Sequence, residues 1–320
     1  MLLSRQPVDR HGIAELRLPY IPGNTSGLFN GTELRTRSRC VFTTPSGMTS
    51  IATPFAYQEF ERNDDANEDD DSLTPVGPVH FRARFMPTEV GKHRFHCEFG
   101  QQLRGTFHVA GHSALPSSPR VSANHQHFER CHDGNGLRSD EMRCTPMWLV
   151  GENIGWGGAW PYHRGSELQS NGSGLSALRF YERVLPKLAG VGGNYFRLWL
   201  GPSLVRDVRR ATWNDGRPST FSALCLHCRT RRFGAYSLEA AWRLDRILTL
   251  ARELRVSALL TLESFQACCV PPKPSRHAPA NPEDIAIVGC WWDESAFNER
   301  NGGPLFRPAG DYTLIALDRT

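Results

Sequence analysis

The run Ala258-Leu-Leu-Thr-Leu-Glu-Ser-Phe265 sets the expected architecture, because it closes a repeated alternation of helix and strand. Its apolar first part reads as a buried strand that leads into a carboxylate, Glu263. The segment before it, residues 238–254, has the spacing of an amphipathic helix. The side of this helix expected to be buried carries Ala241, Leu244, Ile247, Leu248 and Ala251.

The same alternation appears further upstream. Tyr195-Phe-Arg-Leu-Trp-Leu200 reads as a second strand, and Met147-Trp-Leu-Val150 as an earlier one. Between them, residues 175–188 have helical spacing. Its expected buried face carries Leu178, Tyr181, Leu185 and Leu188. Strand, helix, strand, helix, strand is the pattern of a parallel sheet with crossover helices.

The first third of the chain has a different rhythm. Short alternating runs, separated by clusters of Pro, Gly, Asn and Asp, favour an antiparallel β-sandwich. These runs are Ala14–Leu18, Arg39–Thr43, His80–Phe85, Lys92–Cys97 and Gly105–Ala110. A Pro/Ser-rich stretch at 114–119 then predicts a linker.

Composition narrows the classes of function. The net charge is only +4 and no long basic block is present, so we expect no nucleic-acid partner. No apolar run approaches the ~20 residues of a membrane span, and the first ten residues lack the apolar stretch of a signal peptide. The cysteines number nine, an odd count, and their scatter does not predict a small disulfide scaffold. The compartment stays open on these grounds.

Ligands of parallel α/β folds meet the carboxyl ends of the strands. The side chains at these predicted ends combine carboxylates, an amide, a guanidinium and indoles. Indole rings stack on the C–H faces of sugars, and the polar groups form hydrogen bonds with hydroxyls. The sequence therefore predicts a carbohydrate site. Its candidate residues are Glu152, Asn153, Trp156, Arg197, Trp199, Glu263 and Trp292.

Structural alternatives exist for the same residues. Arg197 has an alternative role as the ion-pair partner of Glu152 or Glu263. Each tryptophan has an alternative role as a packing residue of the core or rim. Cys225-Leu-His-Cys228 contains two types of metal ligand, but no second pair follows at the spacing of a zinc site. We expect neither a metal nor a cofactor.

The order of the motifs resembles a known two-part arrangement. The stretches Phe55-Ala-Tyr-Gln-Glu-Phe-Glu-Arg62, Leu73-Thr-Pro-Val-Gly-Pro78 and Arg84-Phe-Met-Pro-Thr-Glu-Val-Gly91 resemble a β-sandwich domain of unknown function. That domain precedes glycoside-hydrolase barrels in bacterial proteins. The second part resembles the opening of such a barrel, of the cellulase-like superfamily (clan A). Its matching stretches are Gly151–Trp156, Asn194–Trp199, Glu239–Asp245, Leu259–Phe265, Trp291–Asp293 and Asn301–Pro304.

The resemblance implies a fold and a division of the chain. The expected fold is multidomain β plus α/β: an Ig-like antiparallel β-sandwich followed by an incomplete (β/α)8 TIM barrel of about three βα units. The expected boundaries are residues 10–112 for the sandwich, 113–145 for a linker and lead-in segment, 146–310 for the partial barrel and 311–320 for a tail unlike the family.

The resemblance also implies an activity. Relatives of this type are retaining hydrolases with two catalytic carboxylates about 5 Å apart, acting on poly- or oligosaccharides. Their acid/base follows an Asn on the fourth strand and their nucleophile ends the seventh. This sequence matches only through the third strand, so we assign neither catalytic residue and expect a truncated, catalytically incomplete chain. Glu263 is then expected to line a sugar subsite.

Two other functions stay open. One is a non-catalytic carbohydrate-binding or adhesion module that uses the β-sandwich. The other is a metal- or redox-dependent protein that uses the clustered cysteines. The resemblance suggests an extracellular location.

Overall fold

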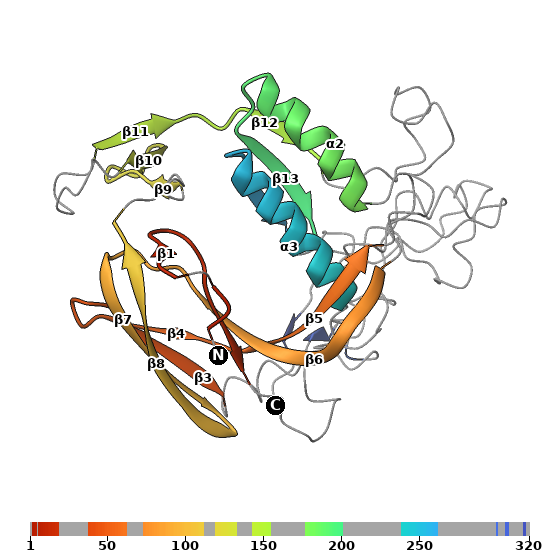
Figure 1. Cartoon of the computed structure of the whole chain (residues 1–320). Helices are drawn as coiled ribbons and strands as arrows, with labels where there is room; N and C mark the ends of the chain where they lie inside the picture. The colour runs from red at the N-terminus through yellow and green to blue at the C-terminus, as the bar shows by residue number, and fades with distance from the viewer. Residues whose placement is uncertain are drawn as a thin grey trace.

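The structure, a computed structural model, describes residues 2–4, 6–18, 38–62, 73–111, 119–132, 143–154, 177–200, 238–261, 299, 305–306 and 316–317. These residues form a β-rich fold with two helices (Figure 1). The first strands are β1 (Val8–Asp9), β2 (Ala14–Leu18), β3 (Arg39–Thr43), β4 (Thr49–Ala52), β5 (Phe55–Arg62), β6 (Leu73–Phe85), β7 (Gly91–Phe99) and β8 (Gln101–Ala110). The later elements are β9 (Arg120–Val121), β10 (Phe128–His132), β11 (Arg143–Met147), β12 (Gly151–Asn153), α2 (Ala177–Gly190), β13 (Tyr195–Trp199), α3 (Leu238–Glu253), β14 (Ser257–Thr261), β15 (Leu305–Phe306) and β16 (Ala316–Leu317).

Strands β1 to β8 form two sheets, with the orders β1-β8-β7-β3-β4 and β2-β6-β5. Every pairing is antiparallel except that of β1 with β8. Alternate side chains of both sheets enter one core, which holds Leu16, Phe42, Phe81 and Phe107 at no more than 2 % exposure. The prediction of a β-rich region over residues 10–110 is therefore confirmed.

Two disulfides join neighbouring strands. Cys40 of β3 and Cys97 of β7 are register partners and are fully buried. Cys131 of β10 and Cys144 of β11 are also register partners and form the second bond. Cross-strand register brings each pair of thiols together, a proximity that spacing in the sequence did not reveal.

Strands β12, β13 and β14 form a parallel sheet in that order. Along the chain, α2 lies between β12 and β13, and α3 lies between β13 and β14. The predicted alternation of strands and helices is confirmed for this region. The position predicted for its first strand, residues 147–150, is wrong: Met147 ends β11 and the parallel strand begins at Gly151. Trp148, the bulkiest residue of the predicted strand, is 77 % exposed.

The side chain of Asn194 and a close approach of two strands at Gly151 explain this shift. The side-chain amide of Asn194 donates to the Trp148 carbonyl at 2.8 Å and accepts from the Val150 N–H at 3.0 Å, so it fixes the segment that leads into β12. Gly151 then lies so close to β13 that a Cβ at this position would collide with the Tyr195 carbonyl oxygen. Pairing here requires a glycine rather than an apolar run.

The two helices differ in how well the sequence predicted their buried faces. Leu178, Tyr181, Leu185 and Leu188 of α2 are buried, as predicted. In α3, Ile247 and Ala251 are buried as predicted, whereas Ala241, Leu244 and Leu248 are half-buried. The other buried residues of α3 are Ala240, Trp242 and Arg243. Helix α3 packs against α2 and β14 on one side and β5 on the other, so its buried surface is wider than one stripe.

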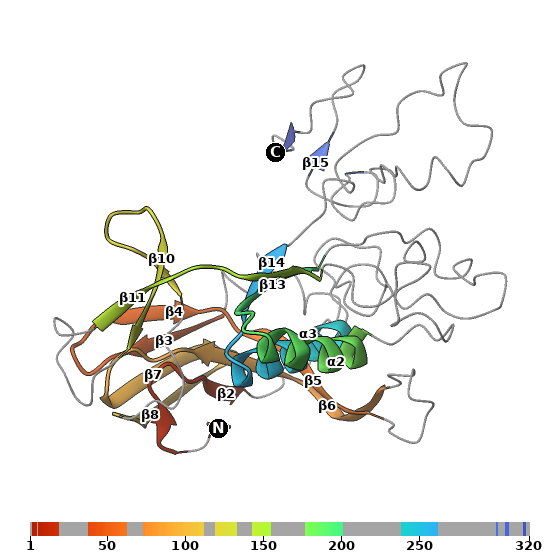
Figure 2. The same ribbon diagram turned by 90° about the horizontal axis from the view of Figure 1, so that it is seen from above.

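A second core crosses from the helices to the first region. It combines residues of α2, α3 and β13 with Tyr57 and Phe60 of β5. The rings of Phe60 and Trp242 meet edge to face with centroids 6.3 Å apart. Figure 2 shows α2 and α3 between the parallel sheet and strands β5 and β6.

Ion pairs reinforce this contact. Arg84 of β6 donates to both carboxylate oxygens of Asp245 in α3, at 2.9 and 2.6 Å, and also to Glu15 of β2. Burial lowers the pKa of Arg84, but hydrogen bonds and charge from Asp245 and Glu15 outweigh burial, so the pKa is raised overall. Arg62 of β5 likewise pairs with Glu182 of α2. The first region and the helices are thus held by charge as well as by apolar contact.

The remaining described elements are small. Strands β9, β10 and β11 form an antiparallel sheet within and just after the predicted linker and lead-in segment. Strands β15 and β16 pair with each other. Neither described helix is long and apolar enough to cross a membrane.

Candidate functional site

The structure places only part of the predicted carbohydrate site. Trp156, Glu263 and Trp292 lie outside the described residues, and only the backbone of Trp199 is described, within β13. Glu152 and Asn153 lie inside β12 rather than after a strand, and Arg197 lies in the middle of β13. Three predicted side chains can therefore be compared in space.

Register brings two of these three together. Asn153 is paired with Arg197, and Arg197 with Leu259 of β14. Because side chains alternate between the faces of a sheet, Thr261 shares the face of Leu259 and Arg197. The Arg197 guanidinium Nε donates to the Thr261 hydroxyl at 2.9 Å. We call Asn153, Arg197 and Thr261 the polar row.

The polar row lies on the face of the parallel sheet that points away from the helices. Phe196 and Leu198, which alternate with Arg197, are fully buried in the core formed with α2 and α3. Glu152 is paired with Phe196 and belongs to that helix-facing side. The carboxylate of Glu152 is exposed, and register separates it from the polar row.

Sequence reasoning missed Thr261 because it ends an otherwise apolar strand. The only signal in the sequence is its position, two residues before the predicted carboxylate Glu263 and on the same alternation. Of the two alternative partners proposed for Arg197, Glu152 belongs to the other face of the sheet and Glu263 lies outside the described residues. The Nε of Arg197 donates to the Thr261 hydroxyl. That contact holds the guanidinium against β14.

The polar row has a defined chemistry. A guanidinium donates hydrogen bonds, a primary amide both donates and accepts, and a hydroxyl does both. The arrangement is therefore suited to holding a hydroxylated ligand, and these three residues supply no proton-transfer group.

One described cluster contains metal-ligand types. Ligand atoms of Glu129, Cys131 and Cys144 lie within 4.8 Å of one another. The two sulfurs are bonded to each other, and Arg120 pairs with Glu129 at 2.8 Å. Since metal ions bind thiolates, a disulfide removes this cluster as a metal site. Cys225 and Cys228 lie outside the described residues.

Comparison with known proteins does not assign the chain to a family. No family model matches it, no curated protein matches it, and no solved structure matches it.

Proposed function

We propose that this chain is a glycoside-hydrolase-like protein that binds a poly- or oligosaccharide on the polar row of its parallel sheet. The observation that carries the proposal is the in-register placement of Asn153 beside Arg197, with Thr261 bonded to the same guanidinium. Planar guanidinium and amide groups form pairs of hydrogen bonds with neighbouring sugar hydroxyls. The face carries no described carboxylate that would repel or compete with such a ligand.

The proposal includes an architecture. Strands β1 to β8 are assigned to an Ig-like β-sandwich, supported by two antiparallel sheets around a shared core. Strands β12 to β14 with α2 and α3 are assigned to the opening units of a (β/α)8 barrel. Three adjacent parallel strands joined through helices support this assignment. In such a barrel the polar row faces inward, where substrates of these barrels bind.

Binding and turnover are separate parts of the proposal. Retaining hydrolysis requires two carboxylates about 5 Å apart, and we assign neither to a residue of this chain. The alternative function is a non-catalytic carbohydrate-binding or adhesion module. The amide, guanidinium and hydroxyl of the polar row favour holding a sugar over cleaving it. Release of the chromophore from aryl glycosides would separate hydrolysis from binding alone.

We also propose an oxidising compartment, such as the cell exterior. Two cross-strand disulfides support it, because such bonds persist chiefly outside the reducing cytosol. Peptide mapping of protein isolated with its thiols blocked is expected to give both bonds. Recovery of all four cysteines as free thiols would contradict this assignment.

The test of binding uses matched variants. Wild-type protein is applied to a printed array of neutral oligosaccharides, and the best-bound glycan is titrated by calorimetry. Arg197→Gln and Asn153→Ala are each expected to weaken binding by roughly tenfold, because each removes hydrogen bonds to the sugar. Lys187→Gln removes an exposed positive charge from α2 and should leave affinity unchanged.

Two outcomes would contradict the proposal. One is the absence of binding to every neutral glycan by folded wild-type protein. The other is binding that Arg197→Gln and Asn153→Ala leave at wild-type strength. Thermal unfolding of each variant distinguishes a lost contact from a lost fold.

A further inference from the structure

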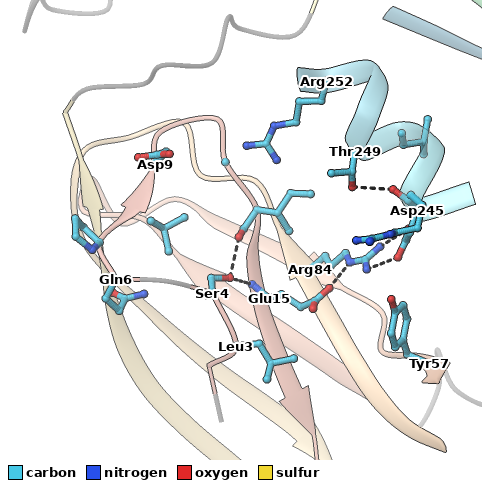
Figure 3. A pocket seen from close by; sticks show the side chains of 16 residues that line it. Leu3, Ser4, Gln6, Asp9, Glu15, Tyr57, Arg84, Asp245, Thr249 and Arg252 are labelled. Atoms are coloured by element: carbon cyan, nitrogen blue, oxygen red, sulfur yellow. Dashed lines mark hydrogen bonds and ion pairs between the residues drawn. The ribbon is translucent and has the colours of Figure 1, made fainter. Parts of the chain in front are cut away.

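A cleft of about 840 Å³ lies between the first region and helix α3 (Figure 3). Residues of the N-terminal segment around β1 and β2 form one wall, and residues of α3 form the other. Tyr57 and Arg84 also line the cleft. The volume falls within the range of about 300–1,000 Å³ common for ligand sites. This cleft is separate from the polar row, which lies on the opposite side of the helix layer.

The inner polar groups of the cleft are bonded to one another. Arg84 joins Glu15 to Asp245 across the two walls. The Ser4 hydroxyl donates to the Ile13 carbonyl at 2.8 Å and accepts from the Glu15 N–H. Thr249 donates to the Asp245 carbonyl at 2.7 Å. Arg84 thus joins the two walls, and the Ser4 and Thr249 contacts each lie within one wall.

Two charged groups at the cleft are not used in this way. In the part of the chain that the structure describes, neither the Asp9 carboxylate nor the Arg252 guanidinium has a hydrogen-bond or ion-pair partner. Figure 3 shows Asp9 on the β1 wall and Arg252 on the α3 wall, with the side chain of Arg252 directed into the space between them. One group accepts hydrogen bonds and the other donates them.

Positive and negative side chains are balanced in the lining of the cleft, and this balance bears on the class of ligand. Its arginines are Arg84, Arg246 and Arg252, and its carboxylates are Asp9, Glu15 and Asp245. This balance gives no preference to an anion or a cation. An apolar ligand would remove Asp9 and Arg252 from water without replacing their hydrogen bonds, which is unfavourable.

We infer that the cleft is a second binding site for a neutral, hydroxyl-rich ligand, a saccharide, held between Asp9 and Arg252. Sugar hydroxyls both donate and accept, so one ligand can satisfy the carboxylate and the guanidinium together. Ile13, which is 45 % exposed on the cleft wall, offers an apolar contact for the C–H face of a ring. Burial, with the charges of Glu59 and Asp245, raises the pKa of Tyr57 to about 12, so its phenol stays neutral beside such a ligand.

The test applies the same neutral-glycan array, followed by calorimetry with the best-bound glycan, to full-length Asp9→Asn and Arg252→Gln variants. Asp9→Asn keeps the size of the side chain and removes its charge, and Arg252→Gln replaces the guanidinium with a shorter neutral amide. Each is expected to weaken binding at one site by roughly tenfold. Glu253→Gln is the matched control, because Glu253 is exposed on α3 and does not line the cleft. Thermal unfolding checks that all three variants fold.

The inference does not rest on the polar row, and variants separate the two sites. In an Arg197→Gln background, where the polar row is impaired, glycan binding should persist and remain sensitive to Arg252→Gln. Binding that survives Asp9→Asn and Arg252→Gln unchanged would overturn the cleft site and leave the polar row untouched. Selective binding of charged or zwitterionic glycans at the cleft would overturn the ligand class.

Discussion

The two main regions of the molecule differ in how the faces of their sheets are covered. The β region comprises residues 8–110 with strands β1 to β8. The α/β region comprises residues 151–261 with strands β12 to β14, α2 and α3. In the β region, residues of both sheets pack into one core. In the α/β region, one face packs on the helices, and the other carries the polar row and Leu259, which is 48 % exposed. Parallel sheets are normally covered on both faces.

The two regions therefore differ in how complete their packing is. The β region has a core of its own and a buried disulfide. The α/β region leaves a polar face accessible and relies on β5 and β6 to complete the packing of its helices.

The largest expected effect comes from the buried disulfide of the β region. Cys40→Ala together with Cys97→Ala opens a loop with a sequence separation of 57 residues, and should lower the free energy of unfolding by about 4 kcal/mol. Cys131→Ala with Cys144→Ala opens a separation of 13 residues, for which the same chain-entropy relation gives about 3 kcal/mol. Chemical denaturation measures both. A larger loss for the second pair would reverse the ranking.

The contact between the β region and helix α3 depends on Arg84. Arg84→Met removes the guanidinium that pairs with Asp245 and Glu15, and leaves two partly buried carboxylates without it. Because Arg84 and Asp245 are 30 % and 27 % exposed, we expect a loss of about 2 kcal/mol, less than for a fully buried pair. Arg39→Met is the control: its pair with Glu98 is 55 % and 44 % exposed, so its removal should cost much less than the removal of Arg84. An equal loss of unfolding free energy in the two variants would show that ion pairing does not stabilise the contact between the regions.

A stabilising change is expected at the end of α3. Arg255 adopts φ 58°, in the left-handed region, while the Val256 N–H donates to the Ala251 carbonyl at 2.8 Å. Glycine adopts this conformation without strain, so Arg255→Gly should raise the free energy of unfolding by about 1 kcal/mol. The change also removes the positive charge of Arg255. Burial is the main cause that lowers the pKa of Arg130, and this charge is the second. Arg255→Ala, which keeps a Cβ, should lack the conformational gain in the same denaturation experiment.

The smallest effect concerns the pH dependence of the β region. His80 is buried, and its Nε2 accepts from the Arg82 Nε at 3.0 Å, so this nitrogen carries no proton in the folded state. Burial, aided by the charges of Arg17 and Arg82, lowers the pKa of His80 below its ordinary 6.5. The unfolded chain therefore takes up a proton first as pH falls, and stability is lost below pH 6.5. His80→Gln should flatten this part of the stability curve; an unchanged slope would contradict the assignment.

Much of the secondary structure could be predicted from sequence. Helical spacing identified α2 and α3, and alternation identified the principal strands of the β region. Apolar runs misplaced β12, because its position depends on the Asn194 amide and on the close approach at Gly151, which hydrophobic patterns do not report. The wide burial of α3 was missed for a related reason: its second contact, with β5, comes from a segment about 180 residues earlier in the chain.

Two of the three polar-row residues were identified from the sequence, and the third was not. The rule that ligands meet strand ends led to Asn153 and Arg197, which register does bring together. Thr261 was not identified, since a hydroxyl at the end of an apolar strand has no distinctive pattern. The cleft beside α3 was also invisible in the sequence, because Asp9 and Arg252 come to line one cleft only through packing of the two regions.

The central claim, that the polar row holds a saccharide, is tested most directly by NMR titration of the Arg197 side-chain Nε–H with the best-bound neutral oligosaccharide. This proton lies in the hydrogen bond to Thr261, so it reports on the polar row itself. We predict a saturable shift of its resonance that follows the calorimetric binding curve, and that remains in the Arg252→Gln variant. Saturation of the protein with glycan while the Arg197 resonance stays unmoved would contradict the account.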